Sequence, residues 1–274
     1  LPSGVLLIGV TMIADYFPTV KGLIIDMDGV LWNDNEPIGD LPIIFNKINQ
    51  IGYKIILATN NPTRTIEEYL KKLMNFGVKL EAWQVINSAQ ALGIFLKQKY
   101  PVGANVYAVG ETSFKKTLAQ HGMRIVDEEF ANPDVVAASV DFQFSYEKLK
   151  HASLKIQKGS IFVGTNPDAT FPTPEGLIPG GGSIIGAIQI ASGQDPIIIG
   201  KPEPALYEMA LSRLQLKPGE TLAVGDRYET DILGAKAAGI HSALVLTGAT
   251  SLEAVNGFNP QPDIICDDLW RLIY

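Results

Sequence analysis

Two aspartates, Asp26 and Asp28, follow the apolar run 23–25 and are separated by one residue. Like charges held this close at the end of a buried strand are unfavourable unless a cation lies between them. Gly29 comes next, and Asp-Gly is also a common turn signal, so an ordinary acidic turn is the alternative explanation for the pair. The polar residues elsewhere in the chain decide between the two.

Further polar groups follow other short apolar runs, at 54–58, 196–199 and 221–224, each of which predicts a buried strand. The residues that follow these runs are Thr59, Asn60 and Asn61, then Lys201, and then Asp226 with Asp231. In open α/β sheets ligands bind beyond the carboxyl ends of the strands. We therefore expect the four strand ends to face one crevice.

Three carboxylates together with a lysine and neutral donors suit a hard divalent cation and an anionic substrate. Mg²⁺ is held by a few carboxylates, carbonyl oxygens and waters, and it leaves positions for phosphate oxygens. A carboxylate can attack phosphorus, and a second carboxyl can protonate the leaving oxygen and then activate water. This constellation predicts phosphate-ester hydrolysis through an aspartyl-phosphate.

The elements that position these residues alternate between strand and helix. Apolar runs and caps predict strands at 23–25, 54–58 and 85–87 and helices at 41–51, 64–75 and 89–99, with Asp40 and Ser88 as helix caps. Strands and helices joined by short connections are typical of a parallel sheet covered on both faces. The fold class is therefore α/β.

The alternation starts again near residue 101. This part predicts strands at 106–109, 135–138 and 161–163, helices at 113–121 and 145–157, and a loop rich in Pro and Gly at 169–182. The first pattern resumes at 196–199. We therefore expect an N-terminal extension at 1–18, a core domain formed by 19–100 and 194–274, and an inserted domain at 101–193.

Composition excludes several partners. The chain of 274 residues carries a net charge of −7 without a basic block, which argues against nucleic acid. Its one cysteine, Cys266, cannot form an internal disulfide, so a reducing, cytoplasmic location is expected. The apolar stretch 4–14 is shorter than the roughly 20 residues of a membrane span. We expect residues 1–11 to precede the natural start and folding to begin near Met12.

Four motifs occur in a fixed order: DMDGVL at 26–31, TNN at 59–61, GKP at 200–202 and GDRYETD at 225–231. In that order they resemble the motifs of phosphatases of the haloacid dehalogenase (HAD) superfamily. With TNPD at 165–168, the chain is similar to subfamily IIA, which includes NagD-like, 4-nitrophenyl phosphate, phosphoglycolate and pyridoxal phosphate phosphatases. The resemblance implies a Rossmann-like core with an inserted α/β cap of the C2 type.

The resemblance also implies a role for each matching residue. Asp26 would be the nucleophile and a Mg²⁺ ligand, and Asp28 the general acid/base, with its main-chain carbonyl on the metal. Asp226 would be a further ligand, and Asp231 would hold either the water shell of the metal or Lys201. From its position alone, Asp231 could instead simply cap the following helix. The residues expected at the phosphate or substrate are Thr59, Asn60, Asn61, Asn166 and Lys201. Lys201 would also be catalytic, because it would neutralise the charges of the nucleophile and of the phosphate.

The resemblance leaves the substrate open among small phosphorylated metabolites: sugar phosphates, nucleotides, phosphoglycolate or 4-nitrophenyl phosphate. The cap loop 165–180 is the expected specificity element. Phe171 stands where related pyridoxal phosphate phosphatases carry a histidine, which argues against that substrate. A homodimer through the cap is also implied.

Two rival functions are weighed against hydrolysis. A dehalogenase shares the aspartate nucleophile but needs neither a second acid nor a metal, so Asp28 and Asp226 argue against it. A catalytically silent binding or scaffold protein could have kept the phosphate pocket. The intact set of Asp26, Asp28, Lys201 and Asp226 favours an enzyme over both.

Overall fold

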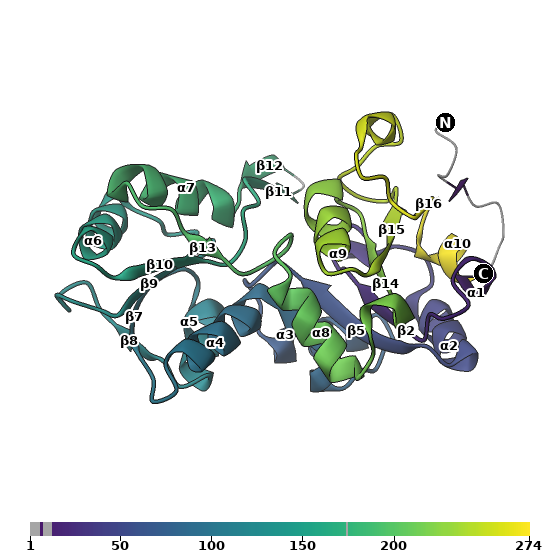
Figure 1. The fold of residues 1–274 in the computed structure, drawn as a ribbon, viewed down its shortest axis with the longest axis horizontal. Coiled ribbons are helices and arrows are strands. Elements are labelled where there is room, and N and C mark those ends of the chain that lie inside the picture. Colours follow the sequence, from purple (N-terminus) through teal and green to yellow (C-terminus); the bar gives the residue numbers. More distant parts are fainter. Residues whose placement is uncertain (1–5, 8–12, 174) are drawn as a thin grey trace. The chain divides into compact units, whose positions relative to one another are not determined.

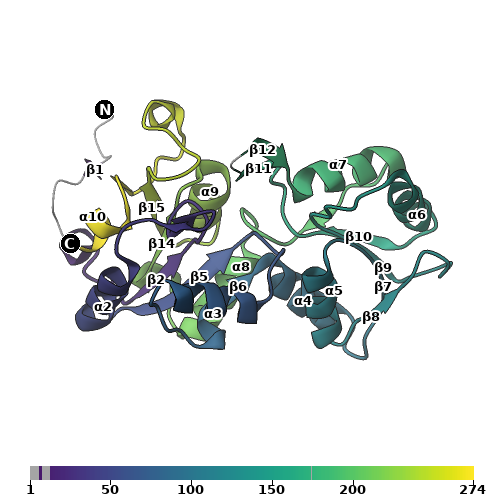
Figure 2. The same ribbon diagram turned by 180° about the vertical axis from the view of Figure 1, so that it is seen from behind.

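The computed structural model describes residues 6–7, 13–173 and 175–274 (Figures 1 and 2). Its chain divides into two compact units. The first, here called the core unit, comprises Leu1–Thr59, Ile66–Ile86 and Pro202–Tyr274. The second, the inserted unit, comprises Asn60–Thr65 and Asn87–Lys201. Each unit is built on its own parallel sheet, which confirms the predicted α/β class.

The sheet of the core unit has seven strands in the order β1-β16-β15-β14-β2-β5-β6, and the pairings from β1 across to β5 are all parallel. The strands are β1 (Leu6–Leu7), β2 (Gly22–Ile25), β5 (Lys54–Thr59), β6 (Val85–Asn87), β14 (Thr221–Gly225), β15 (His241–Val245) and β16 (Ile264–Cys266). From β2 the chain adds β5 and β6 on one side, and it later adds β15 and β16 beyond β14 on the other side. The strand order therefore reverses between β2 and β14, where such sheets bind ligands.

Helices cover both faces of this sheet. They are α1 (Ile13–Tyr16), α2 (Leu41–Ile51), α3 (Ile66–Asn75), α8 (Ala205–Leu214), α9 (Leu233–Ala237) and α10 (Leu269–Ile273). The carboxylate of Asp40 accepts a hydrogen bond from the Ile43 N–H at 3.1 Å, which confirms Asp40 as the N-cap of α2. Alternate strand residues point to opposite faces, so Leu23 and Ile25 pack in the core cluster that includes α2 and α10.

The sheet of the inserted unit has five parallel strands in the order β13-β10-β9-β7-β8. They are β7 (Asn105–Val109), β8 (Arg124–Val126), β9 (Val135–Ala138), β10 (Ile161–Gly164) and β13 (Ile197–Ile198). Helices α6 (Tyr146–Gln157) and α7 (Gly181–Ser192) cover one face of this sheet, and α4 (Ser88–Lys99) and α5 (Thr112–Gln120) cover the other (Figure 1). The helix α4, placed in the core by sequence, belongs to this unit.

Three local predictions are wrong. The strand predicted at 196–199 does not continue the core sheet, because β13 pairs with β10 of the inserted unit. Segment 169–182 is not an open loop: β11 (Thr170–Thr173) and β12 (Gly176–Pro179) form an antiparallel hairpin, and α7 begins at Gly181. The cap of α4 is Asn87, whose side chain accepts the Gln90 N–H at 3.0 Å, and Ser88 is the first helical residue. A short hairpin, β3 (Trp32–Asn33) with β4 (Glu36–Pro37), was also not predicted.

The N-terminal prediction falls mostly outside the described residues, since 1–5 and 8–12 are not among them. Within that stretch, β1 pairs in parallel with β16 and extends the sheet. Among the helices of the described residues, none is both long enough and apolar enough to cross a lipid bilayer. Cys266 is a free thiol in β16, and burial raises its pKa to about 12.

Asp263, just before β16, supports a prediction about stability and pH. Burial raises the pKa of Asp263, but the hydrogen bonds from Lys236 and Ser242 together outweigh it, and the net pKa lies below the ordinary value of 3.8. The contact therefore stabilises the fold above that value and is lost as pH falls through the lowered pKa. Asp263→Asn should reduce the free energy of unfolding by about 1–2 kcal/mol near pH 7.

Urea denaturation near pH 7 and near pH 3 measures this difference, which should shrink at the lower pH. Asp267→Asn, an exposed neighbour in the next loop, is the matched control and should change little. An equal loss of stability at both pH values would contradict the electrostatic origin.

Candidate active site

Three of the predicted strand ends lie side by side in the core sheet. Strand β2 lies between β14 and β5, with Ile25 opposite both Val224 and Leu57. Asp26 follows β2, Thr59 ends β5, and Asp226 follows β14. Because these strands are parallel, their carboxyl ends meet at one edge. The fourth residue of the prediction, Lys201, follows β13, which belongs to the sheet of the inserted unit and not to the core sheet.

Asp26, Asp226 and Asp231 form an acidic cluster at this edge. One carboxylate oxygen from each lies within 4.8 Å of the other two. The three residues are buried, with exposed fractions of 8%, 7% and 3%. Three carboxylates gathered away from water repel one another strongly unless a cation offsets their charge. An all-oxygen donor set of this kind fits a hard divalent ion such as Mg²⁺.

Glycines make room for this cluster. A Cβ atom on Gly29 or on Gly248 would overlap the Oδ2 atom of Asp226, and a Cβ on Gly225 would overlap the side chain of Asp231. Gly29 also has a φ of 83°, which side chains rarely allow. The backbone thus closes around two of the three carboxylates from several sides and leaves their side chains little freedom.

Backbone amides fix the same carboxylates. The Ala249 N–H donates to Oδ2 of Asp226 at 2.6 Å, and the Arg227 N–H donates to Oδ2 of Asp231 at 3.1 Å. Thr250 adds a second link, because its N–H donates to the main-chain oxygen of Asp226 at 3.1 Å. Hydrogen bonds from backbone N–H groups stabilise the ionised form of a carboxylate and fix its orientation.

The segment after Asp226 is a single π-helical turn over Tyr228–Ile232, followed by α9. The π-helical turn was not predicted from the sequence. Wide turns of this type are frequent at functional sites. Asp231 lies inside this turn, and the N-cap of α9 is Ile232, so the capping alternative for Asp231 is wrong. The Tyr207 hydroxyl donates to the Asp231 main-chain oxygen at 2.9 Å and anchors the turn to α8.

Asp28 lies beside the cluster in a tight turn. Its Oδ1 atom accepts a hydrogen bond from the Trp32 indole N–H at 2.8 Å, and the Gly29 N–H donates to the Trp32 carbonyl at 2.8 Å. The Thr247 hydroxyl donates to the Gly29 carbonyl at 2.5 Å. The side chain of Asp28 is therefore directed by Trp32, a contact that was not predicted from the sequence.

A second group of predicted residues lies within the inserted unit. The Lys201 N–H donates to the Asn60 Oδ1 atom at 2.8 Å, and the Asn60 amide donates to the Lys201 carbonyl at 2.9 Å. The amide group thus pairs with both sides of the Lys201 residue, as a strand neighbour would. Lys201 is itself 3% exposed. Asn60 therefore positions the lysine backbone, a role that its residue type alone did not indicate.

Asp168 links the two asparagines of this group. Its Oδ2 atom accepts hydrogen bonds from Asn60 at 2.9 Å and from Asn166 at 2.6 Å. The Thr165 hydroxyl donates to the Asn166 side-chain oxygen at 2.8 Å. The Asn61 side-chain oxygen instead accepts from the Thr63 N–H and hydroxyl and closes a local turn. The TNN and TNPD motifs thus join in one hydrogen-bonded network.

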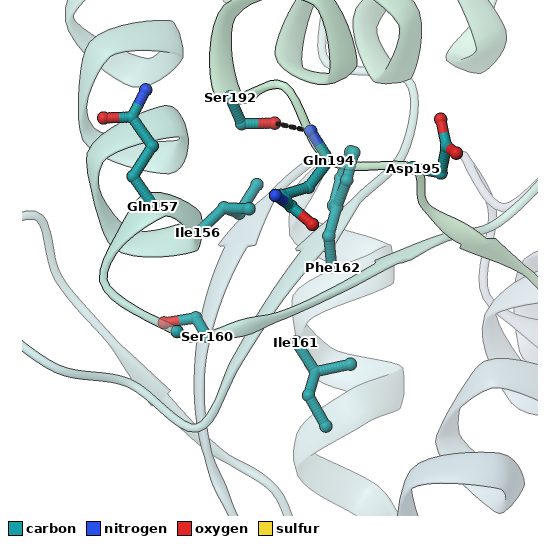
Figure 3. Close-up of a pocket in the computed structure, with 9 residues that line it drawn as sticks. Ile156, Gln157, Ser160, Ile161, Phe162, Ser192, Gln194 and Asp195 are labelled. Carbon is teal, nitrogen blue, oxygen red and sulfur yellow. Dashed lines mark hydrogen bonds between the residues drawn. The ribbon is translucent and has the colours of Figure 1, made fainter.

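The cap loop and its neighbours form the remaining features of the inserted unit. Phe171 on β11 meets Phe142 edge-on, with ring centroids 6.1 Å apart. A hollow of about 470 Å³ lies elsewhere in this unit, between the ends of α6 and α7 and the start of β10 (Figure 3). Asp195 supplies the one charged side chain among the residues that line it, so it lacks the groups that phosphate chemistry requires.

Sequence reasoning missed several residues around the two groups. They are Trp32, Asp168, Gly248, Ala249 and Thr250. A Trp four residues after an acidic motif and an Asp two residues after Asn166 were visible in the sequence. No sequence pattern indicated a role for segment 248–250, because this segment contacts Asp226 only in the folded chain.

Comparison with known proteins places the chain in a family. Residues 23–124 match the model of haloacid dehalogenase-like hydrolases, and residues 198–272 match a second model, described as HAD-hydrolase-like. The acid sugar phosphatase of Staphylococcus saprophyticus is 34% identical, and the match covers 92% of this chain and 96% of that protein.

Solved structures agree. The p-nitrophenyl phosphatase of Archaeoglobus fulgidus superposes with a TM-score of 0.86 at 30% identity, over 93% of this chain and 98% of that one. The glycerol phosphate phosphatase of Mycobacterium tuberculosis, solved in complex with magnesium, gives a TM-score of 0.85 at 34% identity, over 92% of this chain and 76% of that one. The chain belongs to the haloacid dehalogenase superfamily, among the phosphatases of subfamily IIA.

Proposed function

We propose that this protein hydrolyses phosphate monoesters of small metabolites, with Mg²⁺ as cofactor and an aspartyl-phosphate formed on Asp26. The buried acidic cluster carries this proposal, because three carboxylates so close together need a cation. Its place at the point where the strand order reverses supports it, as does membership of a phosphatase family. Relatives named for sugar phosphate, p-nitrophenyl phosphate and glycerol phosphate hydrolysis support the substrate class.

The Mg²⁺ ion would be held by Asp26, Asp226 and the main-chain carbonyl of Asp28, with Asp231 behind them. It would supply charge neutralisation for the nucleophile and for the phosphate oxygens. The hydrogen bond from the Arg227 N–H, which engages one of the two carboxylate oxygens of Asp231, supports this proposed role.

The residues of the chain carry the steps of the reaction. The Asp26 carboxylate attacks phosphorus, and the bond from phosphorus to the ester oxygen breaks. The Asp28 carboxyl gives its proton to that oxygen. In the second half, the Asp28 carboxylate takes a proton from water as the water oxygen attacks phosphorus. The bond to Asp26 then breaks and inorganic phosphate leaves.

Phosphate binding is assigned to Thr59, Asn60, Asn61, Asn166 and Lys201 on the family resemblance. The lysine would contribute a compact positive charge to the phosphate. For Asn60 the hydrogen bonds to both sides of Lys201 add a positioning role. The specificity role of segment 165–180, including Phe171, is proposed on the same ground.

Hydrolysis of 4-nitrophenyl phosphate with and without Mg²⁺ tests the function. Turnover should require the metal and stop when EDTA is added. Without a cation, the negative carboxylates of the cluster would repel the negatively charged phosphate. A panel of sugar phosphates, nucleotides, phosphoglycolate and pyridoxal phosphate then addresses the leaving group, and pyridoxal phosphate is expected to be poor. Metal-independent turnover would overturn the mechanism, and tight binding without turnover would favour the silent binding protein.

We further propose a cytoplasmic protein that forms a homodimer through the cap. The single, buried Cys266 supports a reducing compartment. The dimer follows from the family resemblance, and light scattering of the purified chain tests it. A molar mass of one chain across the micromolar range would contradict the dimer.

A further inference from the structure

We propose that Trp32 is a positioning residue for the reaction. Its indole N–H fixes the Oδ1 atom of Asp28, so that the proton of the acid and base steps is carried on Oδ2. This inference rests on the proposed phosphatase function and deepens it, because it names the atom through which the proton moves and the residue that selects it.

The contact is local and well defined. The Trp32 Nε1 atom donates to Oδ1 of Asp28 at 2.8 Å, and the indole is fully buried. In the turn between them, the Leu31 N–H donates to the Met27 carbonyl at 2.8 Å, and Met27 and Leu31 are fully buried as well. The packed backbone therefore fixes the positions of both Asp28 and Trp32. Because the Trp32 indole is itself fully buried, the hydrogen bond orients the Asp28 carboxyl group rather than the indole.

Proton chemistry follows from this orientation. A neutral carboxyl has one carbonyl-like oxygen, which accepts hydrogen bonds, and one hydroxyl oxygen, which donates. An N–H donor on Oδ1 suits the carbonyl-like oxygen, and it places the acidic proton of Asp28 on Oδ2. That proton passes to the ester oxygen as its bond to phosphorus breaks, and Oδ2 later accepts a proton from the attacking water.

Lys72 strengthens the donor. Its Nζ atom lies 4.1 Å from the centroid of the Trp32 ring and also donates to the Asp34 carbonyl at 2.5 Å, which holds it there. A cation over an indole attracts its π electrons and makes the N–H a better donor. The ring of Phe76, centred 5.9 Å from that of Trp32, packs beside the pair.

A series of aryl phosphates tests the role, because their shapes are alike while the basicity of the leaving group varies. Without an oriented acid, kcat/KM should depend more steeply on leaving-group pKa. For Trp32→Phe, which keeps a ring but removes the N–H, we expect kcat/KM for phenyl phosphate to fall about 10-fold more than for 4-nitrophenyl phosphate. Asp28→Asn should steepen the dependence further, and Trp83→Phe, a more exposed tryptophan, should leave it unchanged.

Lys72→Met provides a second variant that does not open a cavity in the core. It should steepen the dependence in the same direction by about 2- to 3-fold, since only the polarisation of the donor is lost. Lys71→Met, an exposed lysine on the same helix, is its control. Equal losses across the series in Trp32→Phe, or an unchanged slope in Lys72→Met if Trp32→Phe does not fold, would overturn the inference. Failure of the wild-type protein to hydrolyse any aryl phosphate would instead overturn the proposed function.

Discussion

Asp26→Asn is expected to lower kcat for 4-nitrophenyl phosphate by about 10⁴-fold or more, because an amide cannot attack phosphorus. The substitution keeps the size and shape of the side chain. It also removes one of three clustered negative charges. The metal-free variant should therefore be at least as stable as the wild type, so the loss of activity will not come from unfolding.

Two measurements distinguish the loss of the nucleophile from damage to the fold. Acid quenching during turnover should trap a phosphorylated wild-type chain and no phosphorylated variant. Thermal denaturation without Mg²⁺ should give a melting temperature for Asp26→Asn that equals or exceeds that of the wild type. Asp267→Asn, an exposed aspartate, should retain full activity. Activity within about 10-fold of wild type in Asp26→Asn would exclude Asp26 as the nucleophile.

Gly248→Ala is expected to raise the Mg²⁺ concentration needed for half-maximal activity by about 10- to 100-fold. A Cβ atom at this position would overlap Oδ2 of Asp226, the same oxygen that accepts the Ala249 N–H at 2.6 Å. The carboxylate would have to turn away from Asp26 and Asp231, and the cluster would open.

Isothermal titration of Mg²⁺ into the protein measures this effect without any turnover. Gly257→Ala is the matched control, because a Cβ there meets no atom within 4 Å. Neither glycine has a positive φ, so a difference between the two variants reports the contact with Asp226 and not backbone strain. Unchanged Mg²⁺ affinity in Gly248→Ala would argue that Asp226 does not bind the metal.

The sequence predicts those parts of this protein that are encoded by short local patterns. Apolar runs located β2, β5, β9 and β14 to within a residue or two, and the side-chain cap at Asp40 was confirmed. The gathering of Asp26 and Asp226 was also predictable, because residues after parallel strands share one edge of a sheet.

The features that the sequence does not predict depend on contacts between residues that are far apart in the chain. Strand β13 has only two residues, and nothing local states whether it joins one sheet or the other. The hairpin of β11 and β12 lies in a segment whose Pro and Gly residues favoured a loop. Gly248 and Asp168 act through contacts with residues 22 and 108 positions away, and only the folded chain brings those partners together.

The buried thiol of Cys266 has a practical consequence. With a pKa near 12, only about 10⁻⁵ of it is thiolate near neutral pH, and burial blocks reagents as well. The native chain should therefore resist maleimide labelling without any cysteine being removed. A single cysteine placed at an exposed position, such as Asp195→Cys beside the hollow of Figure 3, would then carry one fluorophore at a known site.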